Sequence, residues 1–96
     1  MRKLTRNKGK DYLVYREGQN DTTEIYDIAV TSNRLKGVGT ELIDELKEKT
    51  KGNLFAFMRK SNLIAKAFYL KNGFDVHHIP KFYPDEDAYL ITWKRK

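Results

Sequence analysis

The chain has 96 residues, of which 40% are hydrophobic and 12% aromatic, and this predicts one folded domain, 1–96, with a modest core. It has no cysteine, which excludes disulfides, thiolate metal ligands and a thiol nucleophile. The formal net charge is +6, but basic residues concentrate in the N-terminal segment 1–10 and in 94–96, so that 11–93 carries a net charge of −2. We favour charged, solubilising ends over nucleic-acid binding, since no aromatic residues interleave with these charges.

The sequence gives no sign of a membrane or export segment. No apolar run approaches the roughly 18–20 residues that span a bilayer. The first six residues lack the apolar core of a secretory signal. We therefore expect a cytoplasmic protein without membrane contact.

The N-terminal half predicts strands followed by a helix. Leu4 and Thr5 fit a short edge strand, and β-branched and aromatic residues favour strands over 11–16 and 23–31, with a turn at 17–21 between them. A polar, glycine-bearing loop over 32–39 opens into a helix over about 38–50. The apolar stripe of that helix consists of Val38, Leu42, Ile43 and Leu46.

The C-terminal half predicts a strand, a helix and two strands. The apolar run 54–58 is typical of a strand buried on both faces, with Phe55 and Phe57 in the core, and strand–helix–strand predicts a right-handed crossover between parallel strands. Ser61 is the expected N-cap of a helix over 62–71, whose apolar residues cover most of its circumference and predict a largely buried helix. Strands over 74–79 and 88–93 flank a polar loop, which gives the order β-β-β-α-β-α-β-β.

The loop before the first helix is the sharpest functional feature. Its glycines, Gly37 and Gly39, allow close approach of a ligand to the backbone, and the free N–H groups at a helix start attract anions. Arg34 and Lys36 add positive charge beside it. The loop lacks the Gly-Lys-Ser/Thr ending of a Walker loop, and Leu42 stands at the third glycine position of the dinucleotide pattern. A plain tight turn is the alternative interpretation.

Arg34-x-x-Gly37-x-Gly39 resembles the signature of the GNAT superfamily of N-acetyltransferases. The resemblance implies an α/β fold of the α+β kind, with a mixed, mostly antiparallel sheet around a central β-α-β-α-β unit. It also implies acetyl-CoA as co-substrate. The cofactor-binding residues that it implies are the preceding strand residues Ile28, Ala29 and Val30, and the loop residues Arg34, Lys36, Gly37, Val38, Gly39 and Thr40.

A second match lies downstream, in Asn62-x-x-Ala65-x-x-x-Tyr69-x-Lys71-x-Gly73-Phe74. In GNAT members the asparagine lies near the pantetheine arm and the tyrosine protonates the departing thiolate, which implies these roles for Asn62 and Tyr69. The stretch from Phe82 to Tyr89 resembles the last loop of members that acetylate protein N-termini, and implies substrate contact by Tyr83.

The chain also departs from the family pattern. The family usually has a strand and two helices ahead of this region, so we expect uncovered apolar surface and a homodimer. The strand position that holds a glutamate base in ribosomal-protein N-acetyltransferases is Phe57 here. Glu24 is the carboxylate favoured as general base and Asp27 is the second candidate. Strand alternation places these two carboxylates on opposite faces unless a bulge intervenes.

The sequence therefore predicts an N-acetyltransferase that moves acetyl directly from acetyl-CoA to an amine, with a protein or peptide amine as one candidate acceptor and with Tyr69 and Glu24 as catalytic residues. The alternative is a non-catalytic acyl-CoA-binding or interaction module on a reduced GNAT fold. No metal is expected, because His77 and His78 are adjacent on a strand and point to opposite faces.

Overall fold

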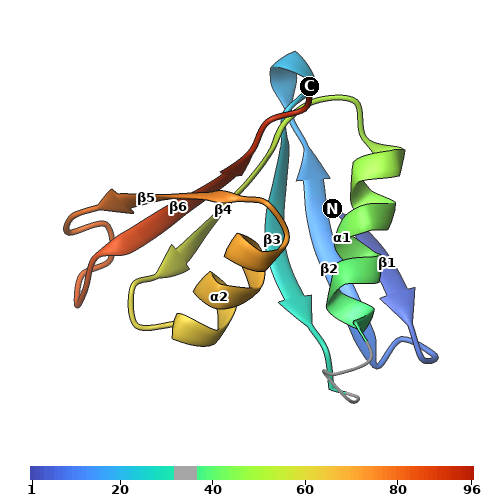
Figure 1. The fold of residues 1–96 in the computed structure, drawn as a ribbon, viewed down its shortest axis with the longest axis horizontal. Helices are drawn as coiled ribbons and strands as arrows, with labels where there is room; N and C mark the ends of the chain where they lie inside the picture. The colour runs from blue at the N-terminus through green and yellow to red at the C-terminus, as the bar shows by residue number, and fades with distance from the viewer. Residues whose placement is uncertain (32–36) are drawn as a thin grey trace.

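The computed structural model describes residues 1–31 and 37–96. Six strands form one sheet in the order β1-β2-β3-β4-β6-β5 (Figure 1). The strands are β1 (Arg2–Arg6), β2 (Asp11–Glu17), β3 (Thr23–Ala29), β4 (Leu54–Arg59), β5 (Asp75–Ile79) and β6 (Ala88–Trp93); the helices are α1 (Val38–Lys49) and α2 (Leu63–Lys71), with a short 3-10 turn, η1 (Gln19–Asp21). The predicted element order is confirmed.

Among the described strands, β3 and β4 pair in parallel, while the other neighbouring pairs are antiparallel. This confirms the expected mixed, mostly antiparallel sheet and the crossover through α1. The edge strand β1 is longer than Leu4 and Thr5 alone suggested, and Arg6 at its end pairs with Glu45 of α1 at 2.6 Å. Part of the basic N-terminal segment is thus built into the sheet.

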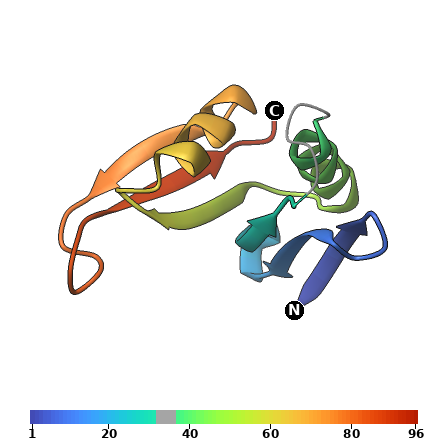
Figure 2. The same cartoon turned by 90° about the horizontal axis from the view of Figure 1, so that it is seen from below.

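Both helices lie on the same side of the sheet (Figure 2). We call this side the helix face and the opposite side the open face. The core fills the helix face, where the predicted stripe of α1 is buried against alternate residues of the strands. Its largest fully buried apolar side chains are Leu13, Leu42, Ile43, Leu46, Leu54 and Ile91.

The parallel ladder between β3 and β4 is short. It joins Thr23 to Leu54 and Glu24 to Phe55, and the two strands then diverge (Figure 1). Beyond Glu24, the edge of β3 that faces β4 forms no ladder with β4. The divergence splits the sheet into one half with β1, β2 and β3 and another with β4, β6 and β5.

A bulge in β3 sets which way its carboxylates face. Arg16 pairs with Glu24 and Val14 pairs with Asp27. These partners are three positions apart on β3 but two positions apart on β2, so β3 carries one extra residue here, which is a bulge. Because Arg16 and Val14 are two apart on one strand, their partners share a face. Glu24 and Asp27 therefore both lie on the open face. The bulge overrides the strict alternation that would have placed them on opposite faces.

Three sequence expectations about α2 and β4 are wrong. Asn62, rather than Ser61, caps α2, and its Oδ1 accepts the Ala65 N–H at 3.1 Å. The helix is not largely buried, since Leu63, Ile64 and Leu70 are exposed. Alternate residues of β4 face the open side, where Phe57 is 37% exposed rather than in the core. Counting apolar residues could not reveal that one sheet face and part of a helix lack cover.

Arg95 belongs to the fold rather than to a solvated tail. Its guanidinium donates to the carbonyl oxygens of Lys47 and Thr50, both at 2.8 Å, and of Gly52 at 3.2 Å. It also lies over the Trp93 ring, 5.0 Å from the centroid. The carbonyls at a helix C-terminus need partners from outside the helix, and Arg95 supplies them for α1.

We predict that Arg95→Ala lowers the free energy of unfolding by about 1.5–3 kcal/mol, since charge-assisted hydrogen bonds are lost and carbonyls are left unpaired. Lys94→Ala, at an exposed neighbouring position, should change it by less than about 0.5 kcal/mol. Urea denaturation followed by circular dichroism measures both variants. Equal stability of the two would show that the Arg95 contacts contribute nothing.

Candidate functional site

The N-terminus of α1 is built to leave backbone donors free. Gly37 adopts a left-handed conformation, φ 72°, which glycine tolerates best, and it offers no capping side chain. The first helical bond runs from the Glu41 N–H to the Gly37 carbonyl at 3.0 Å. The N–H groups of Val38, Gly39 and Thr40 therefore precede the helical ladder and form the positive end of the helix dipole.

Arg34 and Lys36, which were predicted to assist this loop, lie outside the described residues. The described part of the predicted phosphate-binding segment is Gly37 to Thr40. In this part, the helix starts where the sequence predicts it, and Gly37 has the left-handed conformation.

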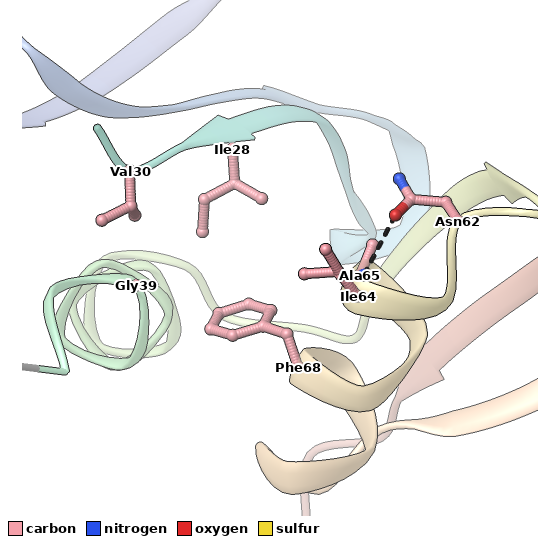
Figure 3. Close-up of a pocket in the computed structure, with 7 residues that line it drawn as sticks. All are labelled: Ile28, Val30, Gly39, Asn62, Ile64, Ala65 and Phe68. Carbon is pink, nitrogen blue, oxygen red and sulfur yellow. Dashed lines mark hydrogen bonds between the residues drawn. The ribbon is translucent and has the colours of Figure 1, made fainter. Parts of the chain in front are cut away.

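An open cavity of about 280 Å³ adjoins this helix end. Ile28 of β3 and Val30, directly after that strand, form one wall, and α2 contributes the opposite wall (Figure 3). The lining residues are Ile28, Val30, Gly39, Asn62, Ile64, Ala65 and Phe68. The cavity is thus a mainly apolar channel that begins near free amides, and this suits a ligand with an anionic part and a long, less polar arm.

Gly39 keeps the channel open. A Cβ at this position would lie 2.8 Å from Cε1 of Phe68, so any side chain here would displace that ring. Phe68 points from α2 toward α1 and β3 (Figure 3). The glycine motif of the loop predicts a role for Gly39, whereas the apolar character of Phe68 gives no sign in the sequence of a place in the site.

Asp11 holds the end of β3 in place. The β2–β3 ladder ends at the Tyr12–Ala29 pair, and the fully buried Asp11 carboxylate continues the connection beyond it. It accepts hydrogen bonds from the Thr31 N–H at 2.7 Å, from the Thr31 hydroxyl at 3.1 Å and from the Asn7 amide. Val30, directly before Thr31, is thereby fixed as part of the cavity wall.

Tyr69 lies one helical turn after Ala65 on α2, and only 4% of it is exposed. Its ring packs edge-on against Phe68 and Phe74. Burial raises the pKa of the Tyr69 phenol above its ordinary value, and the nearby negative charge of Asp27 raises it further. The phenol is therefore protonated at neutral pH and can act as a proton donor.

The two carboxylate candidates of β3 border the point where β3 and β4 diverge. Glu24 sits in the last paired position, opposite Phe55. Asp27 lies beyond it and accepts a hydrogen bond from the Tyr12 hydroxyl at 3.4 Å. Asp27 is also the carboxylate whose charge acts on Tyr69, so the structure brings Asp27 and Tyr69 within electrostatic reach of each other.

The loop 80–87 carries Tyr83 and is tied to the end of β4. Arg59 lies over the Tyr83 ring at 4.4 Å and pairs with Asp85 at 2.6 Å and Glu86 at 3.3 Å. The hydrogen bond from Arg59 lowers the pKa of the Asp85 carboxyl. Glu86 also accepts hydrogen bonds from the Ser61 N–H and hydroxyl, so Tyr83 belongs to a fixed loop rather than a free one.

This geometry coincides with a family pattern. The model of the acetyltransferase (GNAT) family matches residues 11–74, which include the β3–α1 loop, the cavity and Tyr69. The chain belongs to the GNAT family. The resemblance seen in the sequence is thereby confirmed.

Solved GNAT structures share the fold. Ard1 from Thermoplasma volcanium matches with 26% identity and a TM-score of 0.75, over 90% of this chain and 63% of that chain. The ribosomal-protein-S18-alanine N-acetyltransferase from Escherichia coli matches with 26% identity and a TM-score of 0.71, over 94% and 64% respectively. A protein described as a streptothricin acetyltransferase from Bacillus anthracis, in complex with acetyl coenzyme A, matches with 25% identity and a TM-score of 0.81, over 97% and 60%.

The chain therefore spans between 60% and 64% of the length of these three GNAT structures. No curated protein sequence matches it. None of the described helices is long and apolar enough to cross a membrane.

The two histidines take separate roles on the two faces of β5. His77 pairs with Leu90 in the register and bonds Thr92 Oγ1 at 3.1 Å, whereas His78 pairs with Tyr89 and bonds Asp87 at 2.8 Å. They point to opposite faces, as alternation predicts. Within 1–31 and 37–96, no group of three His, Asp or Glu side chains is arranged to hold a metal ion.

We predict a stability loss at alkaline pH that depends on Tyr69. Above about pH 10 the unfolded chain loses the phenol proton while the folded chain keeps it, so stability falls by about 1.4 kcal/mol per pH unit until the native pKa is reached. Tyr69→Phe should lack this component of the decline, and Tyr26→Phe, at an exposed ring, should retain it. Urea denaturation across about pH 9–11 tests this; parallel declines in both variants would contradict it.

Proposed function

We propose that the chain is an acetyl-CoA-dependent N-acetyltransferase that transfers acetyl directly to a primary amine. The observation that carries the proposal is the channel that starts at the uncapped N-terminus of α1 and runs between β3 and α2. An anion site joined to an apolar channel suits a phosphorylated carrier with a pantetheine arm. Membership of the GNAT family supports the same conclusion.

The described residues fit acetyl-CoA in a consistent order. The amides of Val38, Gly39 and Thr40 would hold pyrophosphate, and Arg34 and Lys36, which lie outside the described residues, stay predicted sources of added positive charge. The backbone of Ile28, Ala29 and Val30 would pair with the pantetheine arm, because the ladder from β3 to β4 has already ended before these residues. Asn62 lines the channel, although its side-chain oxygen is used in capping α2; its NH₂ group is left for the arm.

The bound thioester supplies an activated acetyl group. The amine nitrogen attacks the carbonyl carbon, a C–N bond forms and the C–S bond breaks. Glu24 takes a proton from the amine, directly or through water, and Tyr69 gives its proton to the departing sulfur, so the products are an acetamide and free CoA. Tyr69 holds this proton at neutral pH, since the pKa of its phenol lies above the ordinary value.

The second candidate is a module that binds acyl-CoA or a protein without catalysis. It is favoured by the exposed Phe57 at the position of a glutamate base in some family members. The cytoplasmic location and the homodimer expected from the sequence both stay predictions.

We predict that Gly39→Glu abolishes acetyl-CoA binding, since the new side chain would displace Phe68 into the channel and place negative charge beside the phosphate-binding amides. Ala67→Glu adds the same charge on an exposed position of α2 outside the channel, and it should bind normally. Isothermal calorimetry with acetyl-CoA measures both. Unchanged affinity in Gly39→Glu would rule out this site.

We predict that the two proton-transfer variants differ in their pH behaviour. Tyr69→Phe should keep acetyl-CoA binding while kcat falls by roughly 10²–10⁴-fold. Glu24→Gln should show a defect that shrinks as pH rises, because the acceptor amine then deprotonates unaided. Steady-state kinetics across pH, with CoA release as the readout, separates the two effects.

Matched controls for this pair are Tyr15→Phe, which removes a hydroxyl from another buried tyrosine, and Glu17→Gln, at an exposed carboxylate. Full activity of Glu24→Gln at every pH would leave Asp27 or water as the base. Full activity of Tyr69→Phe would remove the proposed acid.

A further inference from the structure

An aromatic wall stands on the open face over β4, the strand that diverges from β3, and is completed by the loop between β5 and β6. Phe57 and Phe82 stack with centroids 4.8 Å apart and an interplanar angle of 11°. Phe55 meets Phe57 edge-on at 6.0 Å, and Tyr83 meets Phe82 edge-on at 5.1 Å. Although they pack together, Phe57 is 37% and Phe82 46% exposed. We call these four rings the aromatic wall.

The wall is held rigidly. Arg59 covers the Tyr83 ring and pairs with Asp85 and Glu86, and Glu86 in turn accepts two hydrogen bonds from Ser61 at the start of α2. The Tyr83 N–H also donates to the Glu86 carbonyl at 3.0 Å. A preorganised, exposed apolar surface loses little conformational entropy when a ligand covers it.

Carboxylates lie along the other side of the divergence. Glu24 faces the open side beside Phe55, and Asp27 follows it on β3. The open face thus offers apolar rings on the β4 side and negative charge on the β3 side. A cationic amine attached to an apolar group matches this distribution of charge and surface.

The proposed acetyl donor lies on the helix face of the same divergence, where Ile28 and Val30 meet α2 (Figure 3). An amine that approaches from the open face reaches the thioester between the two strands, with its substituent left on the wall. Glu24 or Asp27 attracts the ammonium form, which first gives one proton to solvent water, and the neutral amine then reacts with the balance given above.

We propose, resting on the acetyltransferase function, that the acceptor is a primary amine with an aromatic or branched aliphatic group close to the nitrogen, and that Phe57 and Phe82 select it. The two rings are specificity residues: they contact the substituent and not the reacting atoms.

The test compares phenylalaninamide with serinamide, two α-amines that differ in their side chain. The wild-type chain should acetylate phenylalaninamide with a kcat/KM roughly 10–100-fold higher, the range that one apolar group in a pocket provides. Phe57→Ser and Phe82→Ser should each reduce that ratio at least several-fold. Leu70→Ser removes an exposed apolar side chain from α2, away from the wall, and should leave the ratio unchanged.

A direct binding measurement keeps the acceptor proposal separate from the transfer reaction. Phenylalaninamide titrated into the isotope-labelled chain should shift the NMR signals of Phe57 and Phe82, and serinamide should not. NMR shifts without acetyl transfer would support binding of the amine at the aromatic wall and would overturn the acetyltransferase function. Transfer at equal kcat/KM for both amines would retain the acetyltransferase function and would overturn the role of the aromatic wall in selecting the acceptor.

A second copy of the chain is the competing occupant. Light scattering distinguishes it, because a dimer that dissociates in both Phe57→Ser and Phe82→Ser would assign the wall to self-association and overturn the acceptor proposal. A mass that is the same in wild type and variants, together with the lost preference for phenylalaninamide, supports it. Phe82→Ser lies in a loop, so it remains informative even if Phe57→Ser fails to fold.

Discussion

The divergence of β3 from β4 after two paired positions is the constraint on which the rest of the structure depends. Had the parallel ladder continued, its hydrogen bonds would have used the backbone edge at Ile28 of β3 and at Val30 just after it. Because it stops, that edge remains available, and α2 packs beside it to form a channel. The bulge in β3 then turns Glu24 and Asp27 to the open face, so the two sides of the divergence differ in chemistry.

Asp11 shows how the scaffold keeps this opening in shape. A carboxylate with no solvent exposure is costly unless hydrogen bonds compensate it, and Asp11 receives them from Thr31 and Asn7. It connects the β1–β2 hairpin to Thr31, the last residue that the structure describes before Gly37. Gly37 leads the chain into α1 through a left-handed backbone conformation rather than through a side-chain contact.

Most of the fold followed from local patterns. Strand and helix periodicities, and glycines at helix boundaries, predicted the element order, and the Gly37–Gly39 motif predicted the helix start that adjoins the channel. Asp11, Phe68 and Arg95 were missed, because their contacts with Thr31, with Gly39 and with the end of α1 lie 20 or more positions away in the chain, and no local pattern marks them. The burial of α2 and of Phe57 was overestimated, because apolar composition predicts cover, whereas Phe57 and part of α2 are apolar and exposed.

The contacts of Arg95 also affect the order in which the molecule can be completed. The carbonyls of Lys47 and Thr50 at the end of α1 accept hydrogen bonds from Arg95, which lies 48 and 45 positions later in the chain. During synthesis, α1 and the first three strands emerge well before that guanidinium does. The first half of the sheet therefore spends this interval with the end of its helix solvated, and its final stability arrives together with β6.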